Sequence, residues 1–184
     1  MNHASLAPSS WIARWSHLVP PGSEVLDVAC GSGRHMRWFA GRGHAVTGVD
    51  RAPEAIQAAA SYGHVVQADI EDGPWPFTGR EFGCVIVTNY LWRPRLPDIV
   101  AAVAPGGVLL YETFAAGNET VGKPSRPDFL LRPGELLAAC VELQVIAYEN
   151  GFLAAPERFV QRIAAARPGP MAPGAPWRHP LQET

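Results

Sequence analysis

The sequence carries VLDVACGSGRH at residues 25–35, where an apolar run meets a glycine-rich turn and then a helical pattern. The apolar run predicts a buried strand from Glu24 to Ala29, and the later pattern predicts a helix from Arg34 to about Arg42. Gly31 and Gly33 allow the chain to turn sharply and let a ligand approach the backbone. The free N–H groups at the helix start favour negative ligand groups. Such a turn is typical of nucleotide binders, but it also occurs as a plain strand-to-helix connection.

Short apolar runs alternate with helix-like stretches along the rest of the chain, as they do in a parallel sheet with crossover helices. Further strands are predicted at residues 44–49, 65–67, 82–88, 108–113, 143–149 and 158–166, and helices at residues 11–18, 53–62, 96–103 and 132–140. A turn is predicted at 105–107, and the last two strands are predicted to pair antiparallel at one sheet edge. The predicted fold is α/β: a single Rossmann-like, doubly wound, mostly parallel seven-stranded sheet with an antiparallel edge strand.

The length of 184 residues suits one domain with a full hydrophobic core, and a hydrophobic fraction of 47% is typical of a globular protein. We expect residues 1–10 to form a flexible N-terminus and residues 11–166 to form the domain. Residues 167–184 contain five prolines without periodicity, so we expect a disordered tail there.

Charge and cysteine usage exclude several classes of function. The formal net charge of -2 argues against a broad grip on nucleic acid, which needs a basic face. Three widely spaced cysteines without a CxxC pair predict neither a disulfide framework nor a metal site. There is no secretory signal, and no stretch approaches the ~18 apolar residues that span a bilayer. We therefore expect a cytoplasmic protein without a membrane partner; its oligomeric state is not predicted.

Two details narrow the class of nucleotide that the turn would bind. A nicotinamide fingerprint would place a third glycine three residues after Gly33, but that position is Met36, whose bulk would disturb close packing of the helix. Asp50 lies 17 residues after Gly33 at the end of a predicted strand, where a carboxylate can accept hydrogen bonds from both ribose hydroxyls. The alternative role of Asp50 is a helix cap, because Pro53 follows three residues later.

Four segments in this order, VLDVACGSG, VTGVD, QADIED and FGCVIVTNYLW, resemble the landmark segments of class I S-adenosylmethionine-dependent methyltransferases. The resemblance covers roughly residues 24–92. It implies a cofactor site whose residues are Asp27, Ala29, Gly31 and Gly33 around the methionine part, Asp50 at the ribose, Asp69 and Ile70 at the adenine, and Asn89 facing the methionine end and the substrate. Ala29 departs from the pattern, since many members have glycine there.

Within this class, FLLRPGELL at residues 129–137, which follows YETF and a long loop, resembles the tellurite-resistance methyltransferase group. The short chain and the Gly31-Ser32-Gly33-Arg34 turn resemble that group as well. In that group the acceptor is a small molecule or an oxyanion, so the resemblance implies an acceptor of this kind.

The residues that would bind the acceptor are predicted after strands four and five. Lys123 and Arg126, together with nearby arginines, are expected either to clamp an acidic or oxyanionic acceptor or to be scattered solvated charges. Trp92 would wall the acceptor pocket. A soft acceptor such as a thiolate needs little base catalysis, whereas a hydroxyl acceptor needs a general base, for which His35 and Glu112 are the candidates.

Three functions remain open from the sequence. A methyltransferase acting on a small molecule, such as a thiol or an oxyanion, is favoured by the short chain and the slightly acidic charge. A methyltransferase acting on RNA or protein would use the arginines and the tail as a docking surface. A noncatalytic cofactor-binding module is the third, because the sequence identifies no certain base.

Overall fold

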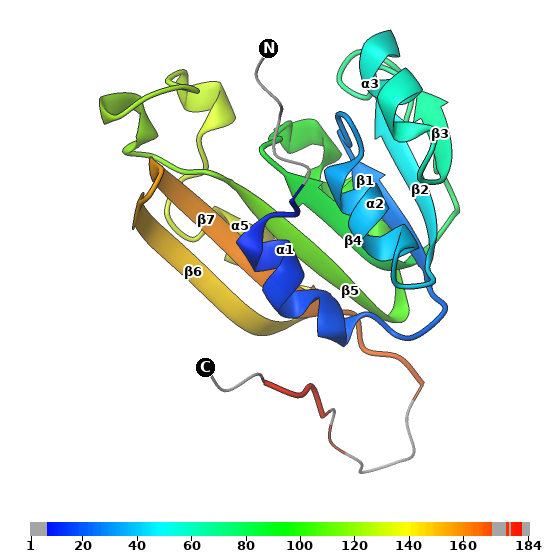
Figure 1. Cartoon of the computed structure of the whole chain (residues 1–184). Helices are drawn as coiled ribbons and strands as arrows, with labels where there is room; N and C mark the ends of the chain where they lie inside the picture. The colour runs from blue at the N-terminus through cyan, green and yellow to red at the C-terminus, as the bar shows by residue number, and fades with distance from the viewer. Residues whose placement is uncertain (1–6, 171–175, 177, 182–184) are drawn as a thin grey trace.

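A computed structural model describes residues 7–170, 176 and 178–181. Seven strands form one sheet in the order β3-β2-β1-β4-β5-β7-β6 (Figure 1). Their bounds are β1 Glu24–Val28, β2 Ala45–Asp50, β3 His64–Gln67, β4 Phe82–Thr88, β5 Val103–Phe114, β6 Gln144–Ala154 and β7 Glu157–Ala166. The strands β1 to β5 are parallel to one another, and β7 is antiparallel to both β5 and β6. The predicted α/β fold is confirmed, and the antiparallel strand lies next to the edge strand β6.

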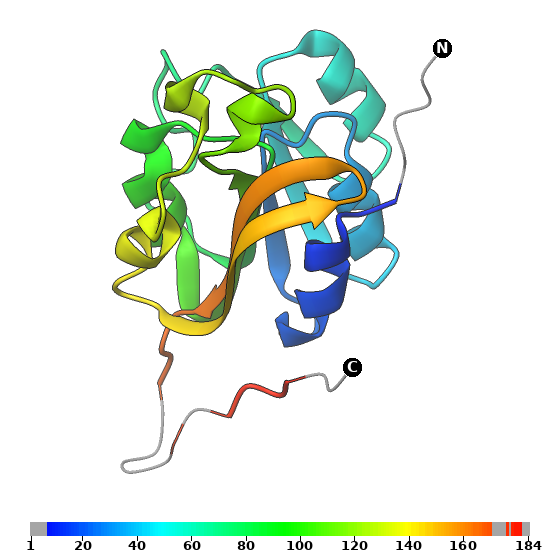
Figure 2. The same ribbon diagram turned by 90° about the vertical axis from the view of Figure 1, so that its left-hand side faces the viewer.

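Helices cover both faces of the sheet, as Figure 2 shows with the β6–β7 hairpin toward the viewer. Their bounds are α1 Ser10–Trp15, α2 Arg34–Ala40, α3 Pro53–Ala59, α4 Leu96–Ala101 and α5 Glu135–Ala139. One hydrophobic cluster lies under α1, α2 and α3, and includes Trp11, Phe39 and Ala59. The other lies under α4 and α5, and includes Ile99 and Leu136. Alternate residues of the central strands supply the two clusters, because side chains along a strand point to opposite faces.

The predicted elements around residue 103 have wrong boundaries. The helix predicted at 96–103 ends at Ala101, and the predicted turn at 105–107 lies inside β5. Val103 pairs with Phe82, and the register shifts between Phe82 and Cys84 as a bulge. Gly106 has φ +78°, a left-handed conformation that glycine adopts without strain. The glycines therefore carry the strand through an irregularity instead of ending it.

The N-terminal boundary of the domain lies earlier than predicted. Residues 1–6 of the predicted flexible terminus lie outside the described residues. Ser9, however, is buried, and its hydroxyl accepts a hydrogen bond from the Trp11 amide at 3.1 Å to cap α1. Because this cap is buried and hydrogen-bonded, the end of the predicted flexible segment belongs to the domain.

The predicted tail also begins one residue later than predicted. Arg167 donates from its guanidinium to the carbonyl oxygens of Val100 at 2.9 Å and Val103 at 2.7 Å, so it belongs to the domain. The His17 ring lies 2.9 Å from the carbonyl oxygen of Pro180. The predicted disorder at 171–175, 177 and 182–184 falls outside the described residues. Within the described part of the chain, no helix combines the length and apolar character needed to cross a bilayer.

Candidate methyl-donor and acceptor site

A cavity of about 150 Å³ opens where β1, β2 and β3 end. Its lining residues are Ala29, Val49, Asp50, Arg51, Ala68, Asp69, Ile70, Glu71 and Tyr90. Four of the residues predicted to hold the cofactor, Ala29, Asp50, Asp69 and Ile70, therefore meet in one cavity. They come together because the carboxyl ends of neighbouring parallel strands lie at the same edge of a sheet.

Asp50 joins the glycine turn to the end of β2. Its Oδ2 accepts a hydrogen bond from the Gly31 amide at 2.9 Å, and its Oδ1 accepts one from the Ala52 amide at 2.9 Å. The alternative role as a helix cap is wrong, because Ala52 is the N-cap residue of α3 and the helix has no side-chain cap. Each carboxylate oxygen keeps a further lone pair that faces no amide. Asp50 is therefore held rigidly while it can still accept hydrogen bonds from a ligand.

The glycine turn is compact where it meets α3 and open elsewhere. Gly33 has φ +80°, and a Cβ at this position would lie 3.0 Å from Ala59 and 3.1 Å from Tyr62. Gly31 has φ +53°, and a Cβ there would meet nothing within 4 Å. Gly33 is thus needed for the packing of α2 against α3, whereas Gly31 leaves open space beside the turn. The Gly31 amide is already bonded to Asp50, so it fixes the turn.

In the part of the chain that the structure describes, two residues other than glycine adopt left-handed backbone conformations, and both follow strands of the site. Ala29, after β1, has φ 53°, and Asn89, after β4, has φ 55°. Such conformations cost free energy for residues with a Cβ, and they concentrate at functional sites. The glycine that many class I members have in place of Ala29 is explained by this conformation. Asn89 accommodates it better, because asparagine tolerates the left-handed region.

Asp27 lies beneath the turn with an exposed fraction of 1%. Its Oδ2 has no hydrogen-bond partner among the described residues. Burial, as the largest effect, raises the pKa of Asp27 to about 7. A buried carboxylate oxygen without a donor is unfavourable unless a ligand supplies one.

His35 is buried beside Asp27, with its Nδ1 3.8 Å from the Asp27 Oδ2. Burial lowers the pKa of His35 to about 3, so the ring is neutral at physiological pH. Its Nε2 accepts a hydrogen bond from the Ser9 amide at 3.2 Å. His35 is buried, and it lines neither this cavity nor a second cavity at the ends of β4 and β5, so its prediction as a general base is wrong.

Asp69 and Ile70 form the far wall of the cavity. The Asp69 Oδ1 accepts hydrogen bonds from the Glu71 amide at 2.9 Å and the Asp72 amide at 3.3 Å, which lower the pKa of Asp69. Ile70 is buried and supplies an apolar surface. A fixed carboxylate beside an apolar surface suits a flat heteroaromatic ring with amino groups.

A second cavity of about 280 Å³ adjoins the first at the ends of β4 and β5. Its lining residues are Glu71, Asn89, Tyr90, Leu91, Thr113, Phe114, Pro124 and Phe129. Glu71 and Tyr90 line both cavities and form their common wall. The Tyr90 hydroxyl is buried without a hydrogen-bond partner among the described residues, and burial raises its pKa. Neither Glu71 nor Tyr90 was predicted, although each directly follows a predicted residue.

The predicted basic clamp is not formed. Lys123 and Arg126 are exposed, and neither lines the second cavity. Arg126 binds Asp128 at 2.9 Å and lies over Phe129. Arg93 binds the Glu135 carboxylate at 2.6 Å, and so faces a partner within the protein. Lys123 and Arg126 therefore do not clamp the second cavity, whereas Arg93 and Arg132 line a separate cavity of about 340 Å³ beside the same loop.

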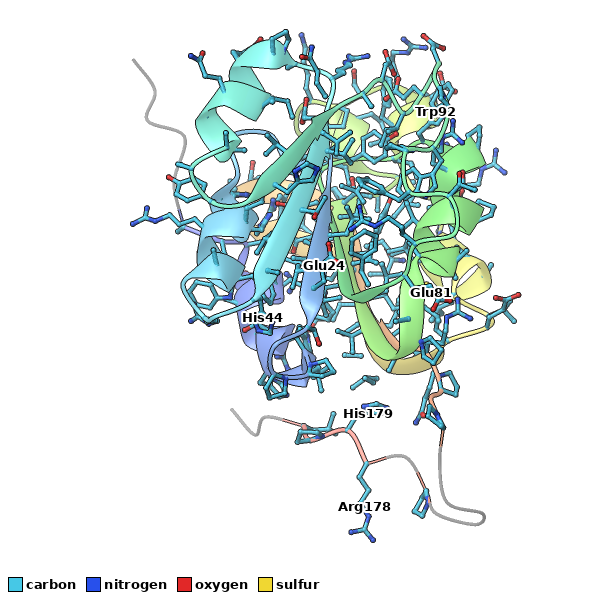
Figure 3. All side chains as sticks on the ribbon, turned by 90° about the vertical axis from the view of Figure 1, so that its right-hand side faces the viewer. Glu24, His44, Glu81, Trp92, Arg178 and His179 are labelled. Atoms are coloured by element: carbon cyan, nitrogen blue, oxygen red, sulfur yellow. The ribbon has the colours of Figure 1, made fainter. Side chains whose placement is uncertain are left out.

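Two more predicted residues lie away from the cavities. Trp92 is at the carboxyl end of the sheet, opposite His44 in Figure 3, but it lines neither cavity, so its prediction as a pocket wall is wrong. Glu112 is buried in an ion pair with Arg162 at 3.1 Å, and it also accepts from the Ser9 hydroxyl at 2.9 Å. These bonds hold the carboxylate away from the second cavity, so Glu112 is not a free general base.

Among the described residues, no group of three or more histidine, cysteine or acidic side chains is placed to bind a metal ion. The three cysteines are free and buried, and burial raises the pKa of the Cys30 thiol in the turn. The prediction that the chain has no metal site stays a prediction.

Comparisons with known proteins find similarity to methyltransferases. Residues 25–107 match the family described as a methyltransferase domain. The chain is 35% identical over 105 residues to a malonyl-[acyl-carrier protein] O-methyltransferase from Serratia marcescens, a match that covers 53% of this chain and 41% of the relative. It is 30% identical over 123 residues to a tRNA U34 carboxymethyltransferase from Hahella chejuensis, covering 58% of this chain and 37% of that relative. The chain thus spans less than half the length of these two relatives.

The structure is also similar to the crystal structure of TehB from Haemophilus influenzae, with a TM-score of 0.68 and 19% sequence identity over 85% of this chain and 61% of TehB. Residues 25–107 thus match a methyltransferase domain, and the sheet order and fold resemble those of the class I S-adenosylmethionine-dependent methyltransferases. Within that class, its fold is similar to TehB, as the resemblance at residues 129–137 implied. S-Adenosylmethionine is the cofactor of the class.

Proposed function

We propose that this chain transfers a methyl group from S-adenosylmethionine to a small-molecule acceptor. The observation that carries the proposal is the pair of adjoining cavities at the carboxyl edge of the sheet, which share Glu71 and Tyr90 as a common wall. One cavity has the carboxylates and apolar surface that a nucleoside needs. The other is of a size for a small acceptor, and its contents would lie next to the donor.

The residues of the first cavity fit the cofactor. The fixed Asp50 carboxylate would accept hydrogen bonds from the ribose hydroxyls, while Asp69 and Ile70 would hold the adenine. The unpartnered Asp27 Oδ2 beneath the turn would receive the ammonium group of the methionine part. Asn89, in its left-handed conformation after β4, would face the methionine end and the acceptor.

When bound, the cofactor supplies a methyl group already activated on a sulfonium. The chain's own residues need mainly to align the two reactants and to exclude water. Tyr90 and Phe129 would do so in the second cavity by covering the acceptor, and the Tyr90 hydroxyl would orient it.

The lining of the second cavity favours a neutral or apolar acceptor over an oxyanion. No arginine or lysine lines it, whereas Leu91, Phe114 and Phe129 do, so an anion there would be buried without a cation in the lining. A thiol or another soft nucleophile on an apolar body suits this environment, because it needs little help from a base. RNA or protein remains the alternative class of acceptor, which the second cavity would admit only as a single protruding group.

A turnover screen with labelled S-adenosylmethionine tests the proposal. We expect S-adenosylhomocysteine to form only when an acceptor is present, and faster with apolar thiols than with selenite, tellurite or bulk RNA. Phe129→Ala should raise KM for the acceptor about tenfold with unchanged cofactor affinity, since it removes a wall of the second cavity. Phe152→Ala is the matched control, because Phe152 is exposed and lines neither cavity. Cofactor binding without any acceptor-dependent turnover would instead favour a noncatalytic module.

A further inference from the structure

A chain of buried polar groups runs from the N-terminal segment to the floor of the proposed cofactor site. Ser9 donates its amide N–H to the Nε2 of His35 at 3.2 Å, and the Nδ1 of His35 lies 3.8 Å from the Oδ2 of Asp27. All three residues are less than one-tenth exposed. The roles proposed above for binding and transfer make no use of Ser9 or His35.

The bond from Ser9 fixes the proton of the His35 ring. Because Nε2 accepts a hydrogen bond, it carries no proton, and in the neutral ring the proton must lie on Nδ1. The Nδ1–H is therefore on the side of Asp27, whose Oδ2 has no other donor among the described residues. A movement of about 1 Å would turn the present distance into a hydrogen bond. Arg34 and Asp50 are the other charged groups whose fields act on Asp27.

The other end of this series of polar groups is anchored to the strands β5 and β7. The Ser9 hydroxyl donates to the Glu112 carboxylate at 2.9 Å, and Glu112 binds Arg162 at 3.1 Å. Glu112 on β5 and Arg162 on β7 are register partners, as are Arg162 and Glu149 on β6. Ser9 therefore sits between a fixed ion-pair row on three strands and the histidine beside Asp27.

We propose that His35 is a positioning residue that couples docking of the N-terminal segment at Ser9 to cofactor binding at Asp27. Docking holds the ring proton on Nδ1, where it stabilises the Asp27 carboxylate that the cofactor's ammonium group requires. If Ser9 leaves, nothing holds the proton on Nδ1, and the ring can turn a lone pair toward Asp27. By reciprocity, the cofactor strengthens the docking. The inference rests on the proposed cofactor site.

Two substitutions at Ser9 isolate the amide that carries the proposal. Ser9→Pro removes the N–H and the hydroxyl, while Ser9→Ala removes the hydroxyl alone. Ser9 has φ -54° and ψ 141°, so proline fits without strain. We expect Ser9→Pro to weaken binding of S-adenosylhomocysteine, measured by calorimetry, about tenfold more than Ser9→Ala does. Equal affinities of the two variants would overturn the proposal.

Three substitutions at His35 separate its two contacts. Gln reproduces an acceptor near Nε2, Asn reproduces a donor near Nδ1, and Leu reproduces neither. We expect His35→Leu to weaken S-adenosylhomocysteine binding about tenfold, and Ser9→Pro to cause no further loss in that background. His35→Gln and His35→Asn should each recover part of the affinity. Additive losses for His35→Leu and Ser9→Pro would contradict the coupling even if both variants fold.

Hydrogen exchange gives a readout that does not depend on affinity. In the wild type, saturating S-adenosylhomocysteine should slow exchange of the Ser9 and Trp11 amides severalfold, and in His35→Leu it should not. Unchanged exchange in the wild type on saturation would overturn the proposal. If the wild type fails to bind S-adenosylhomocysteine at all, the proposed function fails first, and the two failures are thus distinguishable.

Discussion

Two polar atoms in the site are buried without a partner among the described residues: the Asp27 Oδ2 and the Tyr90 hydroxyl. Each costs the ligand-free protein about 1–3 kcal/mol, since desolvation is not repaid by a hydrogen bond. Both atoms lie where the proposed function needs a group to face a ligand. The ligand-free protein is thus less stable than it would be if both atoms had partners. A ligand that forms hydrogen bonds with them would recover this free energy on binding.

The stability of Asp27→Asn should depend on pH differently from that of the wild type. The folded-state pKa of about 7 lies above the ordinary 3.8, so the folded protein keeps the proton to higher pH than the unfolded chain does. The wild type therefore loses stability as pH rises from about 4 to 7, and Asp27→Asn should not. Its advantage in free energy of unfolding should grow over this window to at most about 4 kcal/mol and then stay constant.

Urea unfolding at pH 4.5 and pH 8 checks the prediction, together with S-adenosylhomocysteine binding at pH 8, which should fall at least about tenfold in Asp27→Asn. An equal stability difference at the two pH values would contradict the buried, partnerless state of Asp27. Glu54→Gln, a substitution at an exposed carboxylate on α3, is the control and should change neither quantity.

Tyr90→Phe should likewise raise the stability of the ligand-free protein and weaken its function. Removing the unpartnered hydroxyl should stabilise the ligand-free protein by about 1 kcal/mol, because this position then buries no unsatisfied donor. The acceptor KM should rise severalfold as its orienting group is lost. Thermal melting and steady-state kinetics measure the two effects; a destabilised variant with normal kinetics would show that the hydroxyl is structural.

Ala29→Gly tests the strain in the turn. Ala29 has φ 53°, which costs alanine about 1–2 kcal/mol and glycine almost nothing, although glycine is more flexible in the unfolded chain. We expect a net gain of about 0.5–1 kcal/mol in free energy of unfolding with unchanged S-adenosylhomocysteine affinity. A loss of stability would mean that the Ala29 methyl packs more favourably than its conformation costs.

At the scale of elements, the strands were the most predictable part of the chain. The buried runs in β1, β2 and β4 have no competing pattern, and their predicted ends are within two residues of the observed ones. The start of β5 was missed because Val103 joins the sheet through a bulge, and no local pattern encodes which residue pairs with Phe82. A local run of apolar residues is enough to predict a strand. The residue at which the strand begins depends on pairing with a segment that is distant in sequence.

The connecting loops were predicted less well than the strands, for the same reason. Lys123 and Arg126 were placed correctly in the loop after β5, but a sequence cannot show that Arg126 binds Asp128 or that Arg93 binds Glu135. Likewise, the burial of His35 and Glu112 depends on Ser9 and Arg162, which are remote in sequence. The roles of these side chains therefore depend on ion pairs and burial that a local sequence pattern does not show.

The double variant Lys123→Ala, Arg126→Ala tests whether these two side chains take part in binding the acceptor. Since neither side chain lines a cavity, we expect the acceptor KM and the cofactor affinity to stay within about twofold of the wild type. Steady-state kinetics should be measured at low ionic strength, because surface charges act most strongly there. A tenfold rise in KM for an anionic acceptor would instead show that Lys123 and Arg126 bind the acceptor.

At the scale of the whole molecule, the sheet order brings five of the cofactor residues implied by the resemblance to cavities at one edge: Ala29, Asp50, Asp69, Ile70 and Asn89. That convergence was predictable, because parallel strands end together and the motifs follow the strands. The second cavity was not, because it depends on how the loop holding Pro124 and Phe129 folds over β4 and β5. The donor side of the site is thus encoded locally, and the acceptor side is encoded by tertiary packing.

The central claim is that the cavity at Asp50 binds S-adenosylmethionine, and calorimetry with S-adenosylhomocysteine tests it most directly. The account predicts binding of one molecule per chain to the wild type and at least about tenfold weaker binding to the isosteric Asp50→Asn, with Glu54→Gln unchanged. Absence of binding to the folded wild type at millimolar ligand, or equal binding to Asp50→Asn, would contradict it.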